Sequence, residues 1–94
     1  MKFVWDAAKN DINRQKHRVG FETAQLVFDD PYHVSRQDRI ENGEQRWQTI
    51  GLVRGVVLLL VAHTYAEADG SETVRIISAR KADKTERRIY AEDH

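Results

Sequence analysis

Val56-Val57-Leu58-Leu59-Leu60-Val61-Ala62-His63-Thr64-Tyr65 is the most apolar segment of the chain. Its first seven residues are apolar without interruption, which is typical of a central strand that is buried on both faces. Ala68-Asp69-Gly70-Ser71 follows and predicts a hairpin turn, because Asp and Gly tolerate the positive φ angles that such a turn requires. Residues 73–79 then form the partner strand, so a hairpin lies at the centre of the predicted sheet.

Further strands are expected before this hairpin. Arg54-Gly55 predicts a turn, and residues 46–52 predict the strand that precedes it. Glu41-Asn42-Gly43 is another turn signal, and residues 33–36 are a candidate short strand. The pattern favours a meander of three or four antiparallel strands.

Helices are expected on both sides of the meander. After a short strand at residues 3–5, Asp6 can cap a helix that ends at about His17, because its carboxylate accepts backbone N–H groups. Ala8 and Ile12 give this helix a narrow apolar stripe for docking. A second helix is predicted over residues 21–28, and a last one over residues 83–92.

The predicted fold class is therefore α+β, with two N-terminal helices and one C-terminal helix packed on an antiparallel sheet. Residues 1–94 fit a single domain. No apolar segment is long enough to cross a bilayer or to act as a signal peptide, which favours a cytoplasmic protein without membrane association.

The composition excludes several kinds of site. The chain has no cysteine, which excludes disulfides, thiolate catalysis and cysteine-based zinc sites. His17, His33, His63 and His94 lack the spacing of metal ligands, so neither a metal nor another cofactor is expected.

Basic residues are concentrated near the C-terminus, although the formal net charge is zero. Such a region can hold phosphates even on a neutral protein. A solvated C-terminal helix is the alternative explanation, and charge alone does not decide between the two. Within residues 75–88 the basic residues are Arg75, Arg80, Lys81, Lys84, Arg87 and Arg88, and only Asp83 and Glu86 oppose them.

Several segments in combination resemble the BrnT family of toxins. Arg75-Ile76-Ile77-Ser78-Ala79-Arg80-Lys81-Ala82, followed by Glu86-Arg87-Arg88-Ile89-Tyr90, resembles the C-terminal signature of the family. Further matches occur in the right order upstream, and no single motif is decisive. They are Trp5-Asp6 with Lys9 and Asn13, Lys16-His17 with Phe21-Glu22 and Ala24, Val27-Phe28-Asp29-Asp30-Pro31, and Glu44, Arg46, Ile50 and Gly51.

Two departures from the family pattern stand out. Arg18 occupies the place where a glycine is expected after the histidine, and Gly20 follows two residues later. Residues 67–72 also suggest a loop that is longer than usual, which bears on substrate or partner contacts.

The resemblance implies a RelE-like fold and a metal-independent endoribonuclease, the toxin of a type II toxin–antitoxin system, which cuts cellular RNA and arrests growth. It also implies a BrnA-type antitoxin with a ribbon-helix-helix domain. That partner would neutralise the toxin and bind operator DNA, which the toxin itself would reach only through the antitoxin.

Arg80 is the first candidate for catalysis. Metal-independent RNA cleavage needs a base for the 2′-hydroxyl, cations for the phosphate and a donor for the leaving oxygen. The planar guanidinium of Arg80 suits two phosphate oxygens, while the alternative is a salt bridge to Glu86. Glu86 is a candidate base or a group that orients Arg80, and Arg87 is a further catalytic candidate beside them.

Several residues are predicted to bind RNA. A regular strand would place Arg75 and Arg80 on opposite faces, because they differ by five positions, unless the strand bulges. Arg75 is therefore an RNA or partner contact rather than a catalytic group. Lys81 and Lys84 are candidate phosphate contacts.

The remaining candidates have strong structural alternatives. Tyr90 shares a helix face with Glu86, and it either stacks on a base or holds the helix to the sheet, which is favoured. His63 either provides acid–base chemistry or, as favoured, packs as a hydrogen-bonded residue. Arg46 shares a strand face with Glu44, and it either reaches RNA or pairs with that glutamate. A non-catalytic module that binds nucleic acid or protein is the competing function, because no general base is unmistakable.

Overall fold

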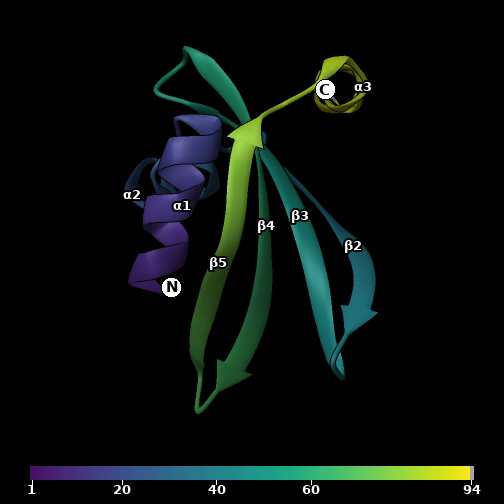
Figure 1. Ribbon diagram of the computed structural model, residues 1–94. Helices are drawn as coiled ribbons and strands as arrows, with labels where there is room; N and C mark the ends of the chain where they lie inside the picture. The colour runs from purple at the N-terminus through teal and green to yellow at the C-terminus, as the bar shows by residue number, and fades with distance from the viewer. Residues whose placement is uncertain (94) are drawn as a thin grey trace.

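A hairpin of two long strands forms the centre of the computed structural model, which describes residues 1–93 (Figure 1). Strands β4 (Val57–Ala68) and β5 (Ser71–Lys81) are antiparallel and meet at Asp69-Gly70, where both residues have positive φ angles of 53° and 76°. These angles match a tight primed turn, so the predicted hairpin is confirmed. The prediction of a long loop at residues 67–72 is wrong, because the strands continue to the turn.

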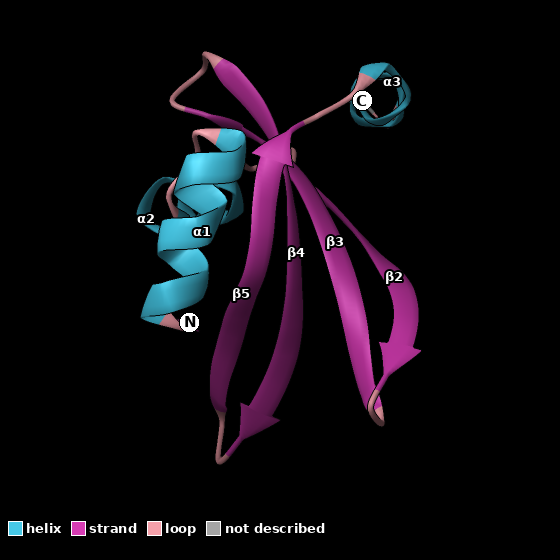
Figure 2. Cartoon of the chain, viewed as in Figure 1, coloured by secondary structure: helices cyan, strands magenta, loops and turns pink. Residues whose placement is uncertain are grey.

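The complete sheet has five strands in the order β1-β5-β4-β3-β2. The order from β5 to β2 can be followed in Figure 2. Strands β3 (Glu44–Val53) and β2 (Val34–Glu41) extend the antiparallel meander, while β1 (Lys2–Val4) pairs in parallel with β5. Strand β2 continues well past the predicted end at Arg36. The sequence did not indicate this extension, because β2 is an edge strand and its exposed polar residues show no alternation of apolar and polar side chains. The α+β class is confirmed, with one parallel pair added.

One face of the sheet, which we call the helix face, is covered in part by the N-terminal helices. Helices α1 (Ala7–His17) and α2 (Phe21–Ala24) and the 3-10 turn η1 (Gln25–Asp29) supply Phe21 and Val27 to the core. Gly51 allows η1 to approach closely, because an added Cβ would lie 2.7 Å from the Val27 Cβ. The helix predicted over residues 21–28 is therefore a single α-turn that continues as 3-10 helix.

Helix α1 docks through asparagines rather than through its apolar residues. Asp6 caps the helix as predicted, but Ile12 is 63% exposed, so the predicted apolar stripe is wrong. Asn10 and Asn13 are buried instead. Asn13 Nδ2 donates to the carbonyl oxygens of Val19 and Ala79, and its Oδ1 accepts from the Ala79 N–H. The Asn13 side chain thus forms the two hydrogen bonds with Ala79 that a neighbouring strand would otherwise form at this edge of β5.

Helix α3 (Lys84–Glu92) lies beyond the end of β5 and contacts β3 on the face opposite α1 (Figure 1). Asp83 caps it as predicted, and Glu86 completes a capping box by accepting from the Asp83 N–H. The Tyr90 hydroxyl donates to Asp30 Oδ2 at 2.6 Å, so the end of α3 is tied to the residue that follows η1.

Arg18 provides a test of how α1 ends. This exposed residue has φ 62° and ψ 26°, a left-handed conformation that glycine adopts without the steric cost of a side chain. Relief of about 1–2 kcal/mol of strain, less the greater freedom of glycine in the unfolded chain, predicts a gain of about 0.5–1 kcal/mol for Arg18→Gly. Urea unfolding measures this gain, and Arg18→Ala, which keeps a Cβ, serves as the control. Equal stability of the two variants would contradict the explanation.

Candidate functional site

A β-bulge brings Arg75 and Arg80 to the same face of the sheet. Ala62 pairs with Ser78, but the next residue of β4, His63, pairs with Ile76, so Ile77 is an extra residue in β5. Leu60 pairs with Arg80 and Thr64 with Arg75, and these β4 residues are four positions apart. Paired residues point to the same side, so the opposite-face arrangement of a regular strand is not observed.

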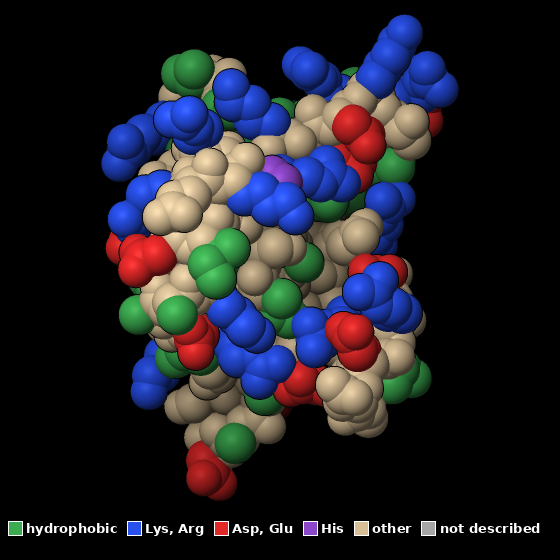
Figure 3. All heavy atoms as spheres, in the orientation of Figure 1, with side chains coloured by type: hydrophobic (Ala, Val, Ile, Leu, Met, Phe, Trp, Pro, Cys, Tyr) green, Lys and Arg blue, Asp and Glu red, His purple; other side chains and the backbone are tan. Residues whose placement is uncertain are grey.

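Two more arginines lie on this face, which α3 covers at one end and no other helix of residues 1–93 covers. Arg36 pairs with Gln48 across β2 and β3, and Gln48 pairs with Ala62 on β4. Arg46 alternates with Gln48 along β3, so it has the same orientation. Figure 3 shows Lys and Arg side chains over the sheet and around α3, with acidic groups among them. We call this surface the open face, and it is defined by Arg36, Arg46, Gln48, Arg75 and Arg80.

Ion pairs and amide contacts hold most of these arginines in place. Arg75 Nη2 lies 2.6 Å from Glu44 Oε1, whereas Arg46 Nη2 lies 3.4 Å from Glu41 Oε2, so the predicted pairing of Glu44 with Arg46 is not observed. The Nε of Arg46 is buried and has no hydrogen-bond partner within residues 1–93. A buried N–H without a partner costs stability, so Arg46 is held less favourably than Arg75 or Arg80.

Arg80 is held by Glu86 in a two-pronged ion pair. Its Nη1 and Nη2 donate to the two carboxylate oxygens at 2.8 and 2.9 Å. The hydrogen bond to Glu86, opposed by partial burial, raises the pKa of Arg80 further above its already high value. The Arg80 side chain is 38% exposed and that of Glu86 only 8%, so the arginine reaches solvent and the glutamate supports it from beneath. This geometry is compatible with the prediction that Glu86 orients Arg80.

The other C-terminal candidates surround this pair. Lys81, Lys84 and Arg87 are exposed, and Lys81 and Arg87 line a shallow hollow beside Val56. Tyr90 is half-buried, and its pKa is raised to about 12 by burial and by the hydrogen bond to Asp30. This contact agrees with the favoured prediction that Tyr90 holds the helix to the sheet.

His63 lies away from the open face. It is 3% exposed, and its pairing with Ile76 places it on the helix face. Its Nε2 lies 2.7 Å from Thr49 Oγ1, and burial lowers its pKa below the usual value, so the ring is neutral at pH 7. The structure therefore agrees with the packed, hydrogen-bonded alternative for His63.

Sequence reasoning missed two contributors. Arg36 lies in the part of β2 that was predicted, but only its pairing with Gln48 shows that it belongs to the open face. Asp30 accepts from the Leu52 N–H and the Tyr90 hydroxyl, and its position before the only proline was the one available signal.

Neither a metal site nor a membrane span is found in the described part of the chain. Within residues 1–93, no three His, Asp or Glu side chains are grouped so that they could hold a metal ion; His94 lies outside the described residues. No helix among these residues has the length and apolar character needed to cross a bilayer.

Comparisons with known proteins give a consistent result. Residues 5–86 match the family model described as "Ribonuclease toxin, BrnT, of type II toxin-antitoxin system". The crystal structure of the Brucella abortus ribonuclease toxin BrnT superposes with a TM-score of 0.61 at 24% sequence identity, covering 89% of this chain and 99% of that chain. This structure supports the fold. Among curated proteins there is no significant match.

Proposed function

Because the chain belongs to the BrnT family of ribonuclease toxins of type II toxin–antitoxin systems, we propose that it is a RelE-like, metal-independent endoribonuclease whose open face binds RNA. It cuts cellular RNA in the cytoplasm and thereby arrests growth. A family of this type implies an antitoxin partner. In our proposal this partner is a BrnA-type protein with a ribbon-helix-helix domain, which neutralises the toxin and carries it to operator DNA.

The observation that carries this proposal is the bulge at Ile77, which adds Arg75 and Arg80 to the face that already holds Arg36 and Arg46. A row of guanidinium groups on a sheet face that α3 covers at one end alone suits the phosphates of a single-stranded RNA. Arg80 is its most ordered member. The described contacts of Arg80 engage three of its N–H donors, two with Glu86 and one with the Lys81 carbonyl, so donors remain for a phosphate.

In the proposed reaction, the ribose 2′-oxygen attacks the adjacent phosphorus while the bond from phosphorus to the 5′-oxygen breaks. The 2′-hydroxyl loses its proton to a base, and the 5′-oxygen gains one as it leaves. Arg80 stabilises the charge that develops on the phosphate, and Glu86 holds the guanidinium in place before the reaction. Arg87 beside them adds positive charge, and Lys81, Lys84, Arg46 and Arg75 bind the flanking phosphates.

A cleavage assay with a chelator tests the function directly. Purified protein is incubated with single-stranded RNA in the presence of EDTA, and the products are resolved by electrophoresis. Cleavage that persists in EDTA supports the proposed reaction, and cleavage that is abolished by EDTA and restored by a divalent cation would contradict it. Expression of the chain in a bacterial host without an antitoxin should also arrest growth.

A non-catalytic RNA-binding module is the second candidate. It is favoured by the absence of a free general base on the open face within residues 1–93, where Glu86 is engaged by Arg80 and His63 lies on the other side. The two functions differ in one assay, because a binding module retards RNA in a gel and leaves it intact. Intact RNA at saturating protein would favour this second candidate.

Salt dependence tests whether the arginines meet phosphates. RNA affinity should fall with salt with a log–log slope of about −0.7 for each phosphate contact. Arg75→Gln should therefore make the slope less steep by about 0.7, because one contact is lost. Lys16→Gln provides the control, since this exposed residue lies on α1 beside the helix face. An unchanged slope in the Arg75 variant would remove Arg75 from the RNA-binding surface.

A further inference from the structure

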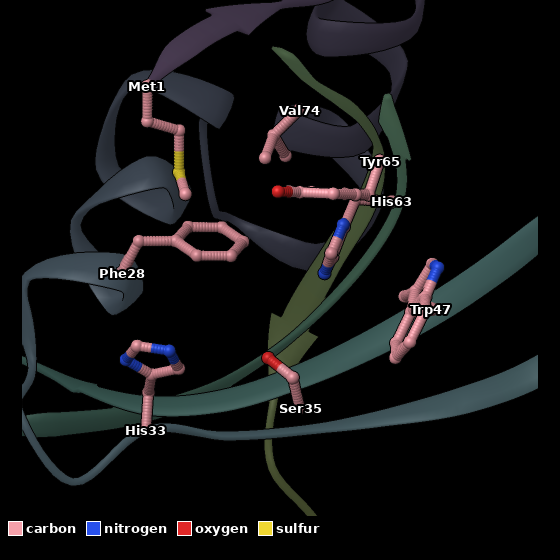
Figure 4. Close-up of a pocket in the computed structure, with 8 residues that line it drawn as sticks. All are labelled: Met1, Phe28, His33, Ser35, Trp47, His63, Tyr65 and Val74. Atoms are coloured by element: carbon pink, nitrogen blue, oxygen red, sulfur yellow. The ribbon is translucent and has the colours of Figure 1, made fainter. Parts of the chain in front are cut away.

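A second cavity lies on the helix face, beyond the part that the helices cover. Its volume is about 270 Å³, which is the size of a site for one side chain or one small ring system. Figure 4 shows the side chains that surround it, which come from Met1 before β1, from η1, from His33 and the start of β2, and from strands β3 to β5. The residues that matter for its chemistry are Phe28, His33, Ser35, Trp47, His63 and Tyr65.

Aromatic rings form most of the cavity wall. The rings of Phe28, Trp47 and Tyr65 approach the cavity from different sides (Figure 4). Phe28 is fixed by a tilted contact with His33, at a centroid distance of 5.9 Å, and by an edge contact with His63, at 5.1 Å. Such a wall attracts a cation, because the faces of aromatic rings carry partial negative charge.

The hydrogen-bond network leaves an acceptor at the cavity. The Thr64 carbonyl accepts from His63 Nδ1, so Nε2 of this neutral ring accepts from the Thr49 hydroxyl. Thr49 Oγ1 then accepts from the Ser35 hydroxyl at 2.7 Å, and the lone pairs of Ser35 stay available to a ligand. His33 Nδ1 likewise donates to the Asp30 carbonyl, which leaves Nε2 of its neutral form as a second acceptor.

Two carboxylates lie beside Tyr65, whose ring lines the cavity. Glu67 and Glu72 are direct cross-strand partners next to the pair Tyr65 and Val74, and neither forms an ion pair within residues 1–93. Burial, the negative charge of both carboxylates and hydrogen bonds from the Tyr65 hydroxyl to them raise the pKa of Tyr65. Like charges directly opposite each other destabilise a sheet unless a cation joins them.

We propose that this cavity is a docking site for one arginine or lysine side chain of a protein partner. The aromatic walls, the acceptor atoms of Ser35 and His33, and the two carboxylates beside Tyr65 are each complementary to a cation that carries N–H groups. A nucleotide is disfavoured because its phosphate would approach Glu67 and Glu72. The site is independent of the proposed ribonuclease function, since it lies across the sheet from Arg80.

Peptide titration followed by NMR tests the proposal, because the two tryptophans report on different places. The Trp47 indole lines the cavity, whereas Trp5 packs edge-on against Phe21 in the core and serves as an internal control. The probe is acetyl-Gly-Arg-Gly-amide, and the matched control replaces arginine by citrulline, which has the same shape without the charge. We expect saturable millimolar shifts of the Trp47 indole with the arginine peptide, several-fold weaker binding of citrulline, and no shift of Trp5.

Variants on the two faces complete the test. Combined Glu67→Gln and Glu72→Gln should weaken the arginine peptide several-fold, while Arg75→Gln on the open face should leave its binding unchanged. The proposal would be overturned by equal binding of both peptides, by no saturable shift, or by stronger binding of adenosine monophosphate. Dilution-dependent Trp47 shifts without any probe would also overturn it, because a second copy of the chain would then fill the cavity.

Discussion

Replacement of Arg80 by alanine should lower the rate of RNA cleavage by about a hundredfold or more, because one preorganised donor at a developing charge contributes about that much. Among residues 1–93, Arg80 is the open-face arginine that a two-pronged ion pair with a buried glutamate holds in place, and the variant loses this guanidinium. The rate constant for cleavage of a single-stranded RNA under single-turnover conditions measures the effect. The same substitution should relieve growth arrest in cells that express the chain.

Two further variants separate charge from geometry at this site. Arg80→Lys keeps the charge but loses the planar fork, so it should recover only part of the rate. Arg36→Ala removes an exposed guanidinium at the far edge of the same face, and it should reduce affinity with little effect on the rate of the bound RNA.

Folding must be measured in parallel, because Arg80→Ala leaves Glu86 without its main partner. The cost is limited, since the Arg80 side chain is 38% exposed and Glu86 still accepts from the Asp83 N–H. A folded Arg80→Ala protein that cleaves RNA at the wild-type rate would refute the catalytic role of this residue. Loss of activity through unfolding would be recognised by urea denaturation, and Arg80→Lys would then carry the test.

The parts of the fold that sequence reasoning predicted are those with a strong local cause. The apolar segment that contains Leu59 and Val61 specified the central strand, and Asp69-Gly70 specified the turn after it. Asp6 and Asp83 marked the starts of two helices, because short carboxylates satisfy the free N–H groups of a first helical turn.

The parts that it missed depend on pairing between distant segments. The bulge at Ile77 has no glycine or proline signal, yet it decides which face Arg75 and Arg80 share. The parallel pairing of β1 with β5 joins residues about seventy positions apart, and no local pattern encodes it. The candidate site was therefore predicted as a set of residues, whereas its arrangement into one face required the sheet register.

The docking of α1 shows the same limit, because polar side chains rather than apolar ones face the sheet. Periodicity of apolar residues is the usual indicator of a buried helix face, and it pointed to Ile12, which is exposed. Asn13 instead supplies the hydrogen bonds that the edge of β5 would otherwise lack at Ala79. Asn13 is therefore important for stability, although an asparagine within a helix does not by itself indicate such a role.

Asn13→Ala should accordingly lower the free energy of unfolding by about 3–5 kcal/mol, a large share of the stability of a small domain. The substitution removes three hydrogen bonds at a side chain that is 5% exposed, and it leaves the Ala79 N–H without a partner at the sheet edge. Urea unfolding followed by tryptophan fluorescence measures the loss. Gln15→Ala, at an exposed position of the same helix, is the matched control and should leave stability nearly unchanged.

Asn13→Asp adds a pH test of the same geometry. Its carboxylate would face the carbonyl oxygens of Val19 and Ala79, so the pKa of the new group should be raised in the folded state. A raised folded pKa means that stability is retained at low pH and lost as pH rises through that pKa. The variant should therefore approach wild-type stability only below about pH 4, where the protonated acid can donate one hydrogen bond.

Stability of Asn13→Ala within about 0.5 kcal/mol of wild type would show that these hydrogen bonds do not hold α1 to the sheet.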